Sequence, residues 1–281
     1  MTYLSKILNE NPFDIFEVDP THLITTEDGK VPLIHWPVAP NFGDLLSPWL
    51  IQKMTGLDTF QNRGEIDSYI VIGSVLKRVK DKTIVWGSGS FGTEQKKNIS
   101  KSAKYCAVRG PLTRSLVRNV KGRCPKVYGD PALLAPCFYS EIPQKTHQIG
   151  LVVRWSDVAW KDLRLDDSVK IIDLKTDDIE GTLHQMLSCE RIVTSSLHGL
   201  IIADAYDIPN VWISSRRPKG GEFKYYDYFL SVDKVCHAQT FQPEEAELLN
   251  ANYFNRFDFD ARDINFDAIK LLDACPFLRR K

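Results

Sequence analysis

Short apolar runs alternate with segments of helical periodicity along the first half of the chain. Four runs are expected to form strands, at residues 31–36, 68–73, 83–86 and 105–108. A helix is expected at residues 44–54, where Asp44 can cap the start and Gly56 can end it. Another is expected from Pro111 to Val117. Continuous apolar strands separated by helices are typical of a parallel sheet covered on both faces.

The second half of the chain repeats this pattern after a polar segment at residues 135–148, which is the expected linker. The expected strands are residues 149–153, 169–173, 191–194 and 210–213, and the expected helices are residues 178–187, 198–206 and, at the C-terminus, 266–277. The fold prediction is α/β, with two parallel-sheet domains at residues 1–140 and 147–281 that face a cleft. In such sheets ligands bind beyond the carboxyl ends of the strands.

Charge and composition narrow the classes of function. The 281 residues carry 36 Lys and Arg against 36 Asp and Glu, a balance that argues against a nucleic-acid binder. No apolar run approaches the roughly 20 residues needed to cross a bilayer, and no signal peptide is evident, so a cytoplasmic location is expected. The six cysteines show no C-x-x-C spacing, which favours reduced thiols and no metal site.

Two glycine-containing turns follow predicted strands of the first half. In Asn41-Phe42-Gly43-Asp44, Gly43 allows close backbone approach and Asp44 can bind or polarise a sugar hydroxyl. The alternative is a helix cap with a glycine turn. In Gly87-Ser88-Gly89-Ser90 the free N–H groups favour an anion nest, whereas the alternative is a flexible turn. This second turn matches neither the phosphate-binding loop of P-loop nucleoside triphosphatases nor the dinucleotide-binding fingerprint.

Arg109 stands at the end of an apolar strand, just before Gly110-Pro111. Its planar fork of donors suits a phosphate or carboxylate, so we expect it to bind substrate. The alternative is an ion pair that holds two loops together. Nearby, Asp130 either braces Arg109 or caps the turn that follows it, and capping is favoured.

The segment Thr194-Ser195-Ser196-Leu197-His198-Gly199 joins a predicted strand to a predicted helix. It places His198 at a helix N-terminus, at the mouth of the expected cleft. The helix N-terminus lowers the pKa of a histidine, whereas a bound trianion raises it, so the protonation of His198 can follow ligand binding. This predicts a general acid or base, or an anion-binding group; the alternative is a structural histidine.

Six motifs occur in the order and spacing of the polysaccharide pyruvyl transferase family, which this chain resembles from about residue 35 to residue 230. They are Asn41-Phe-Gly-Asp44, Gly87-Ser-Gly89, Val108-Arg-Gly-Pro111, Gly129-Asp-Pro131, Ser195-Ser-Leu-His-Gly199 with Ile202-Ala-Asp-Ala-Tyr206, and Gly221-Glu-Phe-Lys224. The resemblance is nearest to the branch that contains the ketal-forming enzyme of succinoglycan synthesis.

The resemblance implies Rossmann-like domains arranged as in GT-B glycosyltransferases and phosphoenolpyruvate as donor, with no further cofactor. It also implies an acceptor sugar, often lipid-linked, whose diol becomes a cyclic pyruvate ketal, and it makes peripheral membrane contact through that acceptor an expectation. It assigns the donor to Arg109 and His198, and less firmly to Lys224. Where relatives often carry Pro-His, this chain has Val153-Arg154, so Arg154 is a candidate substitute cation.

The candidate residues therefore fall into two groups. His198 is expected to be the acid, or the group that stabilises departing phosphate, and Asp44 the base for the acceptor. The expected substrate-binding residues are Asn41, Gly43, Ser88, Gly89, Arg109, Arg154, Ser196, Leu197 and Lys224.

Two other functions fit the same sequence. One is a glycosyltransferase with a nucleotide-sugar donor, although no base-stacking pocket is evident. The other is a non-catalytic carbohydrate-binding protein that stacks tryptophans on sugar rings, although most of the six are expected in strands or helices and are more simply core residues: Trp36, Trp49, Trp86, Trp155, Trp160 and Trp212. The basic and aromatic residues 214–228 suggest either a mobile loop over the cleft or a solvated surface loop.

Overall fold

The fold is described from a computed structural model that covers the chain except residues 37, 155, 215–219 and 246. The first half forms a five-stranded parallel sheet. Its strands, in spatial order, are β3 (Thr59–Gln61), β2 (Val31–Leu33), β4 (Ser68–Ile70), β5 (Thr83–Trp86) and β6 (Lys104–Ala107). The helices α2 (Phe42–Thr55) and α3 (Pro111–Asn119) belong to this half.

A second parallel sheet, of four strands, forms the other half. Its order is β10 (Asn210–Trp212), β9 (Cys189–Thr194), β7 (His147–Val153) and β8 (Val169–Asp173), with helices α4 (Ile179–Leu187), α5 (Leu197–Ala205), α6 (Phe223–Phe229) and α7 (Ala251–Phe254). Leu151 in β7 pairs with Ile171 on one side and Val193 on the other, and its own side chain is fully buried. The α/β class with parallel sheets is therefore confirmed.

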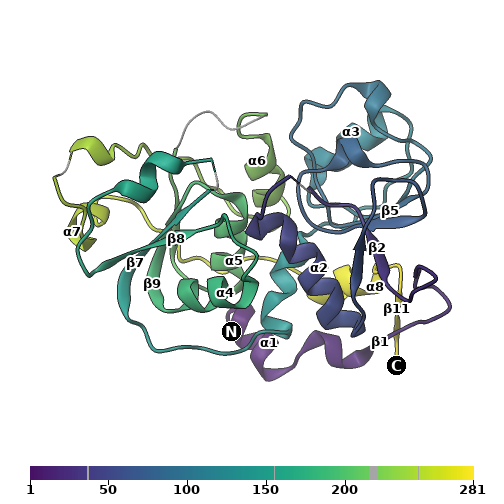
Figure 1. Cartoon of the computed structure of the whole chain (residues 1–281), viewed down its shortest axis with the longest axis horizontal. Helices are drawn as coiled ribbons and strands as arrows, with labels where there is room; N and C mark the ends of the chain where they lie inside the picture. Colours follow the sequence, from purple (N-terminus) through teal and green to yellow (C-terminus); the bar gives the residue numbers. More distant parts are fainter. Residues whose placement is uncertain (37, 155, 215–219, 246) are drawn as a thin grey trace.

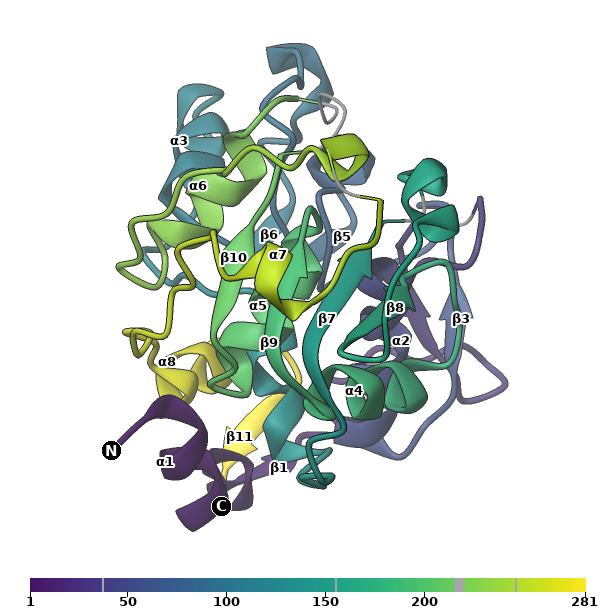
Figure 2. The ribbon, with the colours of Figure 1, turned by 90° about the vertical axis from the view of Figure 1, so that its left-hand side faces the viewer.

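The two sheets lie side by side, and α2 runs between the halves (Figure 1). In the view of Figure 2, the second sheet faces the reader with α4 and α5 beside it. Trp49 on α2 donates its indole N–H to Glu180 on α4 at 3.1 Å, which ties the halves together along this helix. The domain boundaries at residues 140 and 147 stay a prediction.

The expected start of α2 was wrong by two residues. Asn41, not Asp44, occupies the N-cap position, and the Asn41 side chain makes no capping bond, because its amide donates to the Asp44 carboxylate instead. The other end is as predicted: Gly56 ends the helix in the left-handed conformation, with φ of 71°.

The first residues of the expected linker belong to the core. Ala135 and Pro136 are buried in a 3-10 helix at Pro131–Cys137, and the Leu133 carbonyl in this helix accepts the Tyr3 hydroxyl of α1 (Tyr3–Asn9) at 2.7 Å. Asp130 caps the 3-10 helix by accepting the Ala132 N–H, which confirms its predicted capping role. The apolar residues of this segment bury it in the core, although its prolines had suggested a linker.

The C-terminal segment returns to the first half of the molecule. After α8 (Ala268–Asp273), strand β11 (Leu278–Arg280) pairs antiparallel with β1 (Phe16–Val18). Phe277 is fully buried with its ring centroid 5.2 Å from that of Tyr69 in β4, and the Leu271 carbonyl accepts the Trp86 indole N–H at 2.8 Å. The C-terminal helix is therefore shorter than the predicted residues 266–277, and the strand that follows it was not predicted.

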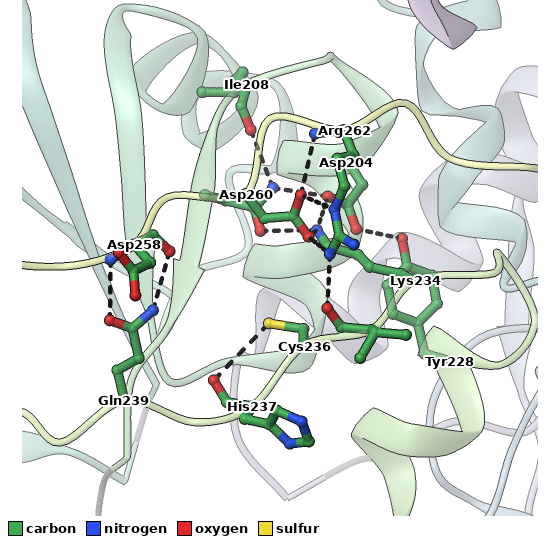
Figure 3. A network of polar contacts seen from close by, with 12 residues as sticks. Asp204, Ile208, Tyr228, Lys234, Cys236, His237, Gln239, Asp258, Asp260 and Arg262 are labelled. Carbon is green, nitrogen blue, oxygen red and sulfur yellow. Dashed lines mark hydrogen bonds and ion pairs between the residues drawn. The ribbon is translucent and has the colours of Figure 1, made fainter.

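A buried polar network fixes the segment that leads to this tail (Figure 3). The Lys234 ammonium donates to Asp204 on α5 at 2.6 Å and lies 3.5 Å from Asp260. Arg262 in turn pairs with Asp260 at 2.7 Å, and Tyr228 donates to the other Asp204 oxygen at 2.8 Å. The network therefore links α5, α6 and the chain around residue 260.

Across the described residues, no helix is both long and apolar enough to span a bilayer. All six cysteines are free thiols, and Cys124, Cys189 and Cys275 are buried. Burial raises the pKa of Cys124 to about 11, so this thiol is not poised for redox chemistry.

Candidate active site

A cavity of about 550 Å³ lies between the two halves, where strands of both sheets end. The first half contributes Trp36, Asn41, Asp44, Gly73, Ser74, Val75, Lys77, Arg78 and Phe91, and the second half contributes Arg154, Ser156, Leu174, Ser196, Leu197, His198 and Lys224. Seven residues predicted from the sequence are thus brought together here: Asn41, Asp44, Arg154, Ser196, Leu197, His198 and Lys224. Gly43, Ser88, Gly89 and Arg109 lie outside this lining.

His198 stands in the first turn of α5. Ser196 is the N-cap of this helix, and its hydroxyl faces the Gly199 N–H at 3.5 Å. Burial, together with the nearby charges of Lys224 and Arg109, lowers the pKa of His198 to about 3. The imidazole is therefore neutral at neutral pH, and an anionic ligand that offsets those charges would raise its pKa.

The absence of a side chain at Gly43 leaves the space that the His198 ring occupies. A Cβ atom on Gly43 would lie 2.0 Å from His198 Nδ1 and 2.7 Å from Cε1 of the same ring. Only glycine leaves room for the imidazole against the first turn of α2. Gly43 was predicted to allow close approach of a ligand; the group that approaches it in this structure is the histidine.

Asp44 is the one acidic side chain among the cavity-lining residues described. Burial raises the pKa of Asp44 to about 6, against the opposing effects of the Asn41 hydrogen bond and of Lys224. A carboxylate with this pKa can accept a proton near neutral pH, which is the property that the predicted base requires.

Lys224 reaches the cavity from α6, with its ammonium 4.9 Å from the Tyr225 ring centroid and 5.8 Å from that of Phe91. Burial, then the charges of Arg154 and Arg109, lower the pKa of Lys224 to about 7, while Asp44 acts in the opposite direction. The like charges that surround this lysine are those that an anionic ligand would offset.

Arg154 lies at the end of β7 and is held in a two-point ion pair with Asp157. Its Nε and Nη2 donate to the two carboxylate oxygens at 3.0 and 2.9 Å. Asp157 also accepts the Ser195 hydroxyl at 2.5 Å. The Ser195 hydroxyl thus helps to hold the Asp157 carboxylate that pairs with Arg154, and this arrangement does not support a nucleophilic role for Ser195.

Arg109 is fully buried behind the cavity. Its Nε pairs with Asp227 of α6 at 3.2 Å, Nη1 donates to the Ser74 hydroxyl at 2.8 Å, and Nη2 donates to the Ser90 carbonyl at 2.8 Å. Arg109 therefore forms the ion pair that the sequence analysis gave as the alternative to substrate binding. Its link to the cavity is the hydrogen bond to Ser74, which lines the cavity. Direct contact between Arg109 and a substrate stays a prediction.

The hydrogen-bond donors of the glycine-serine turn at residues 87–90 are likewise bound to groups of the protein itself. The Gly89 N–H and the Ser88 hydroxyl both donate to the Gly73 carbonyl, at 2.9 and 2.7 Å. A Cβ atom on Gly89 would lie 2.3 Å from the Arg109 guanidinium carbon, so this glycine makes space for the arginine. The predicted anion nest therefore has its donors turned toward the protein in this structure.

Two cavity-lining cations were missed in the sequence, Lys77 and Arg78. They lie in a single 3-10 turn, Leu76–Arg78, that follows β4. The signal that could have found them is Gly73, whose φ of 103° turns the chain sharply after an apolar strand and brings Ser74 to the cavity. Neither cation belongs to a motif that the sequence analysis used.

The tryptophans considered for stacking on sugar rings lie partly in the core and partly at the cavity. Trp86 and Trp212 are buried core residues, whereas Trp36 lines the cavity. Trp155 and residues 215–219 of the expected loop lie outside the described residues, so the mobility of residues 214–228 stays a prediction. Within the described chain, no cluster of three or more His, Cys, Asp or Glu side chains is placed to hold a metal ion.

The sequence pattern of the polysaccharide pyruvyl transferase family matches residues 4–217, a stretch that contains every cavity-lining residue named above except Lys224. The chain belongs to this family. The predicted resemblance is therefore confirmed.

Relatives of the chain agree with this membership. An uncharacterised protein of Acanthamoeba polyphaga mimivirus is 33% identical over 206 residues, 68% of this chain and 70% of that protein. The succinoglycan biosynthesis protein ExoV of Rhizobium meliloti is 27% identical over 245 residues, 79% of this chain and 72% of that protein. A crystal structure of a Klebsiella pneumoniae protein of uncharacterised function aligns with a TM-score of 0.47 at 10% identity, covering 75% and 93% of the two chains; this is too weak to carry an argument.

Proposed function

We propose that this chain transfers the pyruvyl group of phosphoenolpyruvate to a sugar diol in an exopolysaccharide or cell-surface glycan precursor, giving a cyclic pyruvate ketal. The observation that carries the proposal is the charge of the cavity. Lys77, Arg78, Arg154 and Lys224 line it together with a single described carboxylate, Asp44. A small, multiply charged anion would offset this excess, and phosphoenolpyruvate is close to a trianion near neutral pH.

The chemistry follows from the same charges. A proton added to the methylene carbon makes the adjacent carbon electron-poor, one sugar hydroxyl bonds to that carbon, the carbon–oxygen bond to phosphate breaks, and the second hydroxyl closes the ring. In this proposal the cations stabilise the leaving phosphate, and His198 and Asp44 move protons, each such transfer contributing roughly 10²–10⁴-fold in rate. In this scheme binding of the trianion raises the pKa of His198 from its low ligand-free value.

The acceptor belongs to the same proposal. A polysaccharide-modifying family implies a glycan acceptor, and ExoV is named for succinoglycan biosynthesis. The two halves would act as in GT-B glycosyltransferases, with donor and acceptor meeting in the cavity between them. We further propose a cytoplasmic enzyme that meets a lipid-linked acceptor at the membrane surface.

The test of this function is phosphate release from phosphoenolpyruvate, measured with a panel of lipid-linked and synthetic glycosides. A thermal-shift series with phosphoenolpyruvate and nucleotide sugars accompanies it. The proposal requires stabilisation by phosphoenolpyruvate and acceptor-dependent release of phosphate. Stabilisation by a nucleotide sugar instead would indicate a glycosyltransferase, and acceptor binding with no turnover would indicate a carbohydrate-binding protein.

The role of His198 is tested within the same assay. His198→Ala is expected to lower the rate of acceptor-dependent phosphate release by about 100-fold or more, because the proton-transferring or charge-stabilising group is lost. Release at the wild-type rate would remove His198 from the mechanism. The exposed His22 offers a control, since His22→Ala should leave the rate unchanged.

A further inference from the structure

We propose that Asp130 is the positioning partner of His198: the two form a dyad in which the Asp130 carboxylate holds the proton of the imidazole on Nε2 and leaves the Nδ1 lone pair to the cavity. The pairing itself is independent of the substrate. What the proton does during turnover rests on the function proposed above.

The dyad is inferred from two buried atoms that lack partners. His198 Nε2 and Asp130 Oδ2 are both buried and make no hydrogen bond, and they lie 3.9 Å apart. Elsewhere in the described chain, Arg78 Nε alone shares this condition. A buried polar atom without a partner costs roughly 1–3 kcal/mol, so two such atoms facing each other call for a functional reason.

The Asp130 side chain is fixed by its cap. Its Oδ1 accepts the Ala132 N–H at 3.1 Å, at the start of the 3-10 helix that packs beside α5. The carboxylate is fully buried, and Oδ2 is the oxygen directed at the histidine. The gap of 3.9 Å exceeds a hydrogen bond by about 1 Å, and such bonds in ligand-free enzymes often tighten only when the substrate binds.

The orientation of the imidazole decides which nitrogen can act. Nε2 is buried, whereas the His198 side chain as a whole is 14% exposed and lines the cavity. Nδ1 packs against Gly43 and, unlike Nε2, is not a buried atom without a partner, so we assign it as the nitrogen that a ligand can approach. A carboxylate accepts and never donates when ionised, and it therefore selects the tautomer with hydrogen on Nε2.

The charged groups around the dyad set its behaviour with pH. Lys224 and Arg109 oppose a positive charge on His198, and Asp44 faces the same cavity. Burial raises the pKa of Asp130 to about 6, with Arg109 lowering it and Asp227 raising it. The carboxylate is therefore ionised above pH 6 and loses its accepting role as the pH falls below that value.

During turnover the dyad would move one proton. His198 takes a proton from solvent on Nδ1 when the trianion binds, and Asp130 balances the imidazolium. When the carbon–oxygen bond to phosphate breaks, the phosphate oxygen keeps the electron pair of that bond and takes the proton from Nδ1, whose lone pair is restored. The acceptor hydroxyl gives its proton to Asp44 as its oxygen bonds to the electron-poor carbon. Asp130 does not line the cavity, so it acts only through His198.

The dyad can be tested without any substrate by ¹⁵N NMR of the histidine rings in the full-length protein, with His198→Gln used to assign the His198 signals. At pH 7.5 the wild type is expected to show hydrogen on Nε2 and none on Nδ1. In Asp130→Asn this tautomer should no longer dominate, because the amide can donate to Nε2. Asp204→Asn is the matched control: it changes a buried carboxylate on the same helix, within the network of Figure 3, and should leave the His198 signals unchanged.

Two NMR results would overturn the dyad: hydrogen on Nδ1 of His198 in the wild type, or the same tautomer in Asp130→Asn as in the wild type. The first result is obtained on the wild type alone, so it does not depend on the variant folding. In phosphate release, Asp130→Asn is expected to lower kcat by roughly 10²–10⁴-fold with little change in KM for phosphoenolpyruvate. It should add nothing to His198→Ala, whereas a merely structural role would lower the rate further. The expected NMR result without any phosphate release would retain the dyad and reject the proposed function.

Discussion

At the scale of single residues, the cavity is built from groups that alter one another's protonation. Lys224 has its pKa lowered to about 7 and Asp44 has its pKa raised to about 6, both chiefly by burial. His198 is held neutral by the same burial and by the neighbouring cations. Burial is the main cause of all three shifts, and neighbouring cations add to the lowering of the Lys224 and His198 pKa values, so a bound anion would raise both.

Lys224 makes donor affinity dependent on pH. Its protonated form attracts the anion, and its pKa of about 7 means that the charge is lost progressively above neutrality. Affinity for phosphoenolpyruvate should therefore fall by roughly tenfold between pH 7 and pH 8.5, as measured by isothermal titration calorimetry. Lys224→Arg keeps its charge over this range and should bind with little pH dependence, whereas Lys224→Met should bind weakly throughout. A wild-type affinity that is flat with pH would contradict this account of Lys224.

Much of this residue-level picture could not be predicted from the sequence. Local motifs identified His198, Asp44, Arg154 and Lys224, because each stands at a strand end or next to a glycine turn. The sequence could not show that the Arg109 side chain forms an ion pair with Asp227, which lies 118 positions further along the chain. That pairing depends on how α6 of the second half meets the start of α3 of the first half, which no local pattern encodes.

At the scale of elements, the first turn of α2 and the first turn of α5 meet across the cavity at Gly43 and His198. The sequence predicted both helices to within two residues at each end, and it predicted β5 and β8 to the residue. The start of α2 was misplaced because the Asn41 amide binds Asp44 rather than capping the backbone. The 3-10 turn that carries Lys77 and Arg78 has no periodicity to predict it.

Gly43→Ala tests the contact between these helices. In a helix this exchange ordinarily stabilises by about 0.5–1 kcal/mol, but here the new methyl would displace the imidazole. Phosphate release should fall by about 100-fold, because a displacement of about 1 Å of a catalytic group has that effect, while the protein stays folded by circular dichroism.

The control for this variant is Gly56→Ala at the other end of α2. Gly56 has open space around it but a φ of 71°, so alanine there should cost about 1 kcal/mol of stability and leave the rate unaltered. Equal rates for Gly43→Ala and wild type would show that His198 does not need the position seen here.

At the scale of the whole molecule, the contacts that join the halves include those along α2 and α4, those of the C-terminal tail that returns to β1, and the buried Arg109–Asp227 ion pair. The sequence predicted two parallel sheets but not the return of the tail, because the apolar residues near Phe277 indicate burial without indicating where. The ion pair is linked to the cavity through Ser74, which accepts a hydrogen bond from Arg109 and lines the cavity.

The ion pair predicts a stability effect that a purely substrate-binding arginine would not have. Asp227→Ala leaves the buried Arg109 charge uncompensated and should lower the free energy of unfolding by roughly 3–5 kcal/mol in urea titrations. The double variant Arg109→Met with Asp227→Leu should lose much less, because both charges are removed. A loss below about 1 kcal/mol for Asp227→Ala would mean that Arg109 is held by something other than this pair.

The central claim is that the cationic cavity between the halves is the site where phosphoenolpyruvate gives up its pyruvyl group. The most direct measurement follows phosphoenolpyruvate labelled with ¹³C at C2, incubated with the protein and the glycoside acceptor that supports phosphate release. The account predicts that the label moves to a saturated carbon bonded to two sugar oxygens, with one phosphate released per ketal, and that Lys224→Met and His198→Ala both suppress this signal. Label that remains in phosphoenolpyruvate with every acceptor that the protein binds, or a ketal formed equally well by both variants, would contradict it.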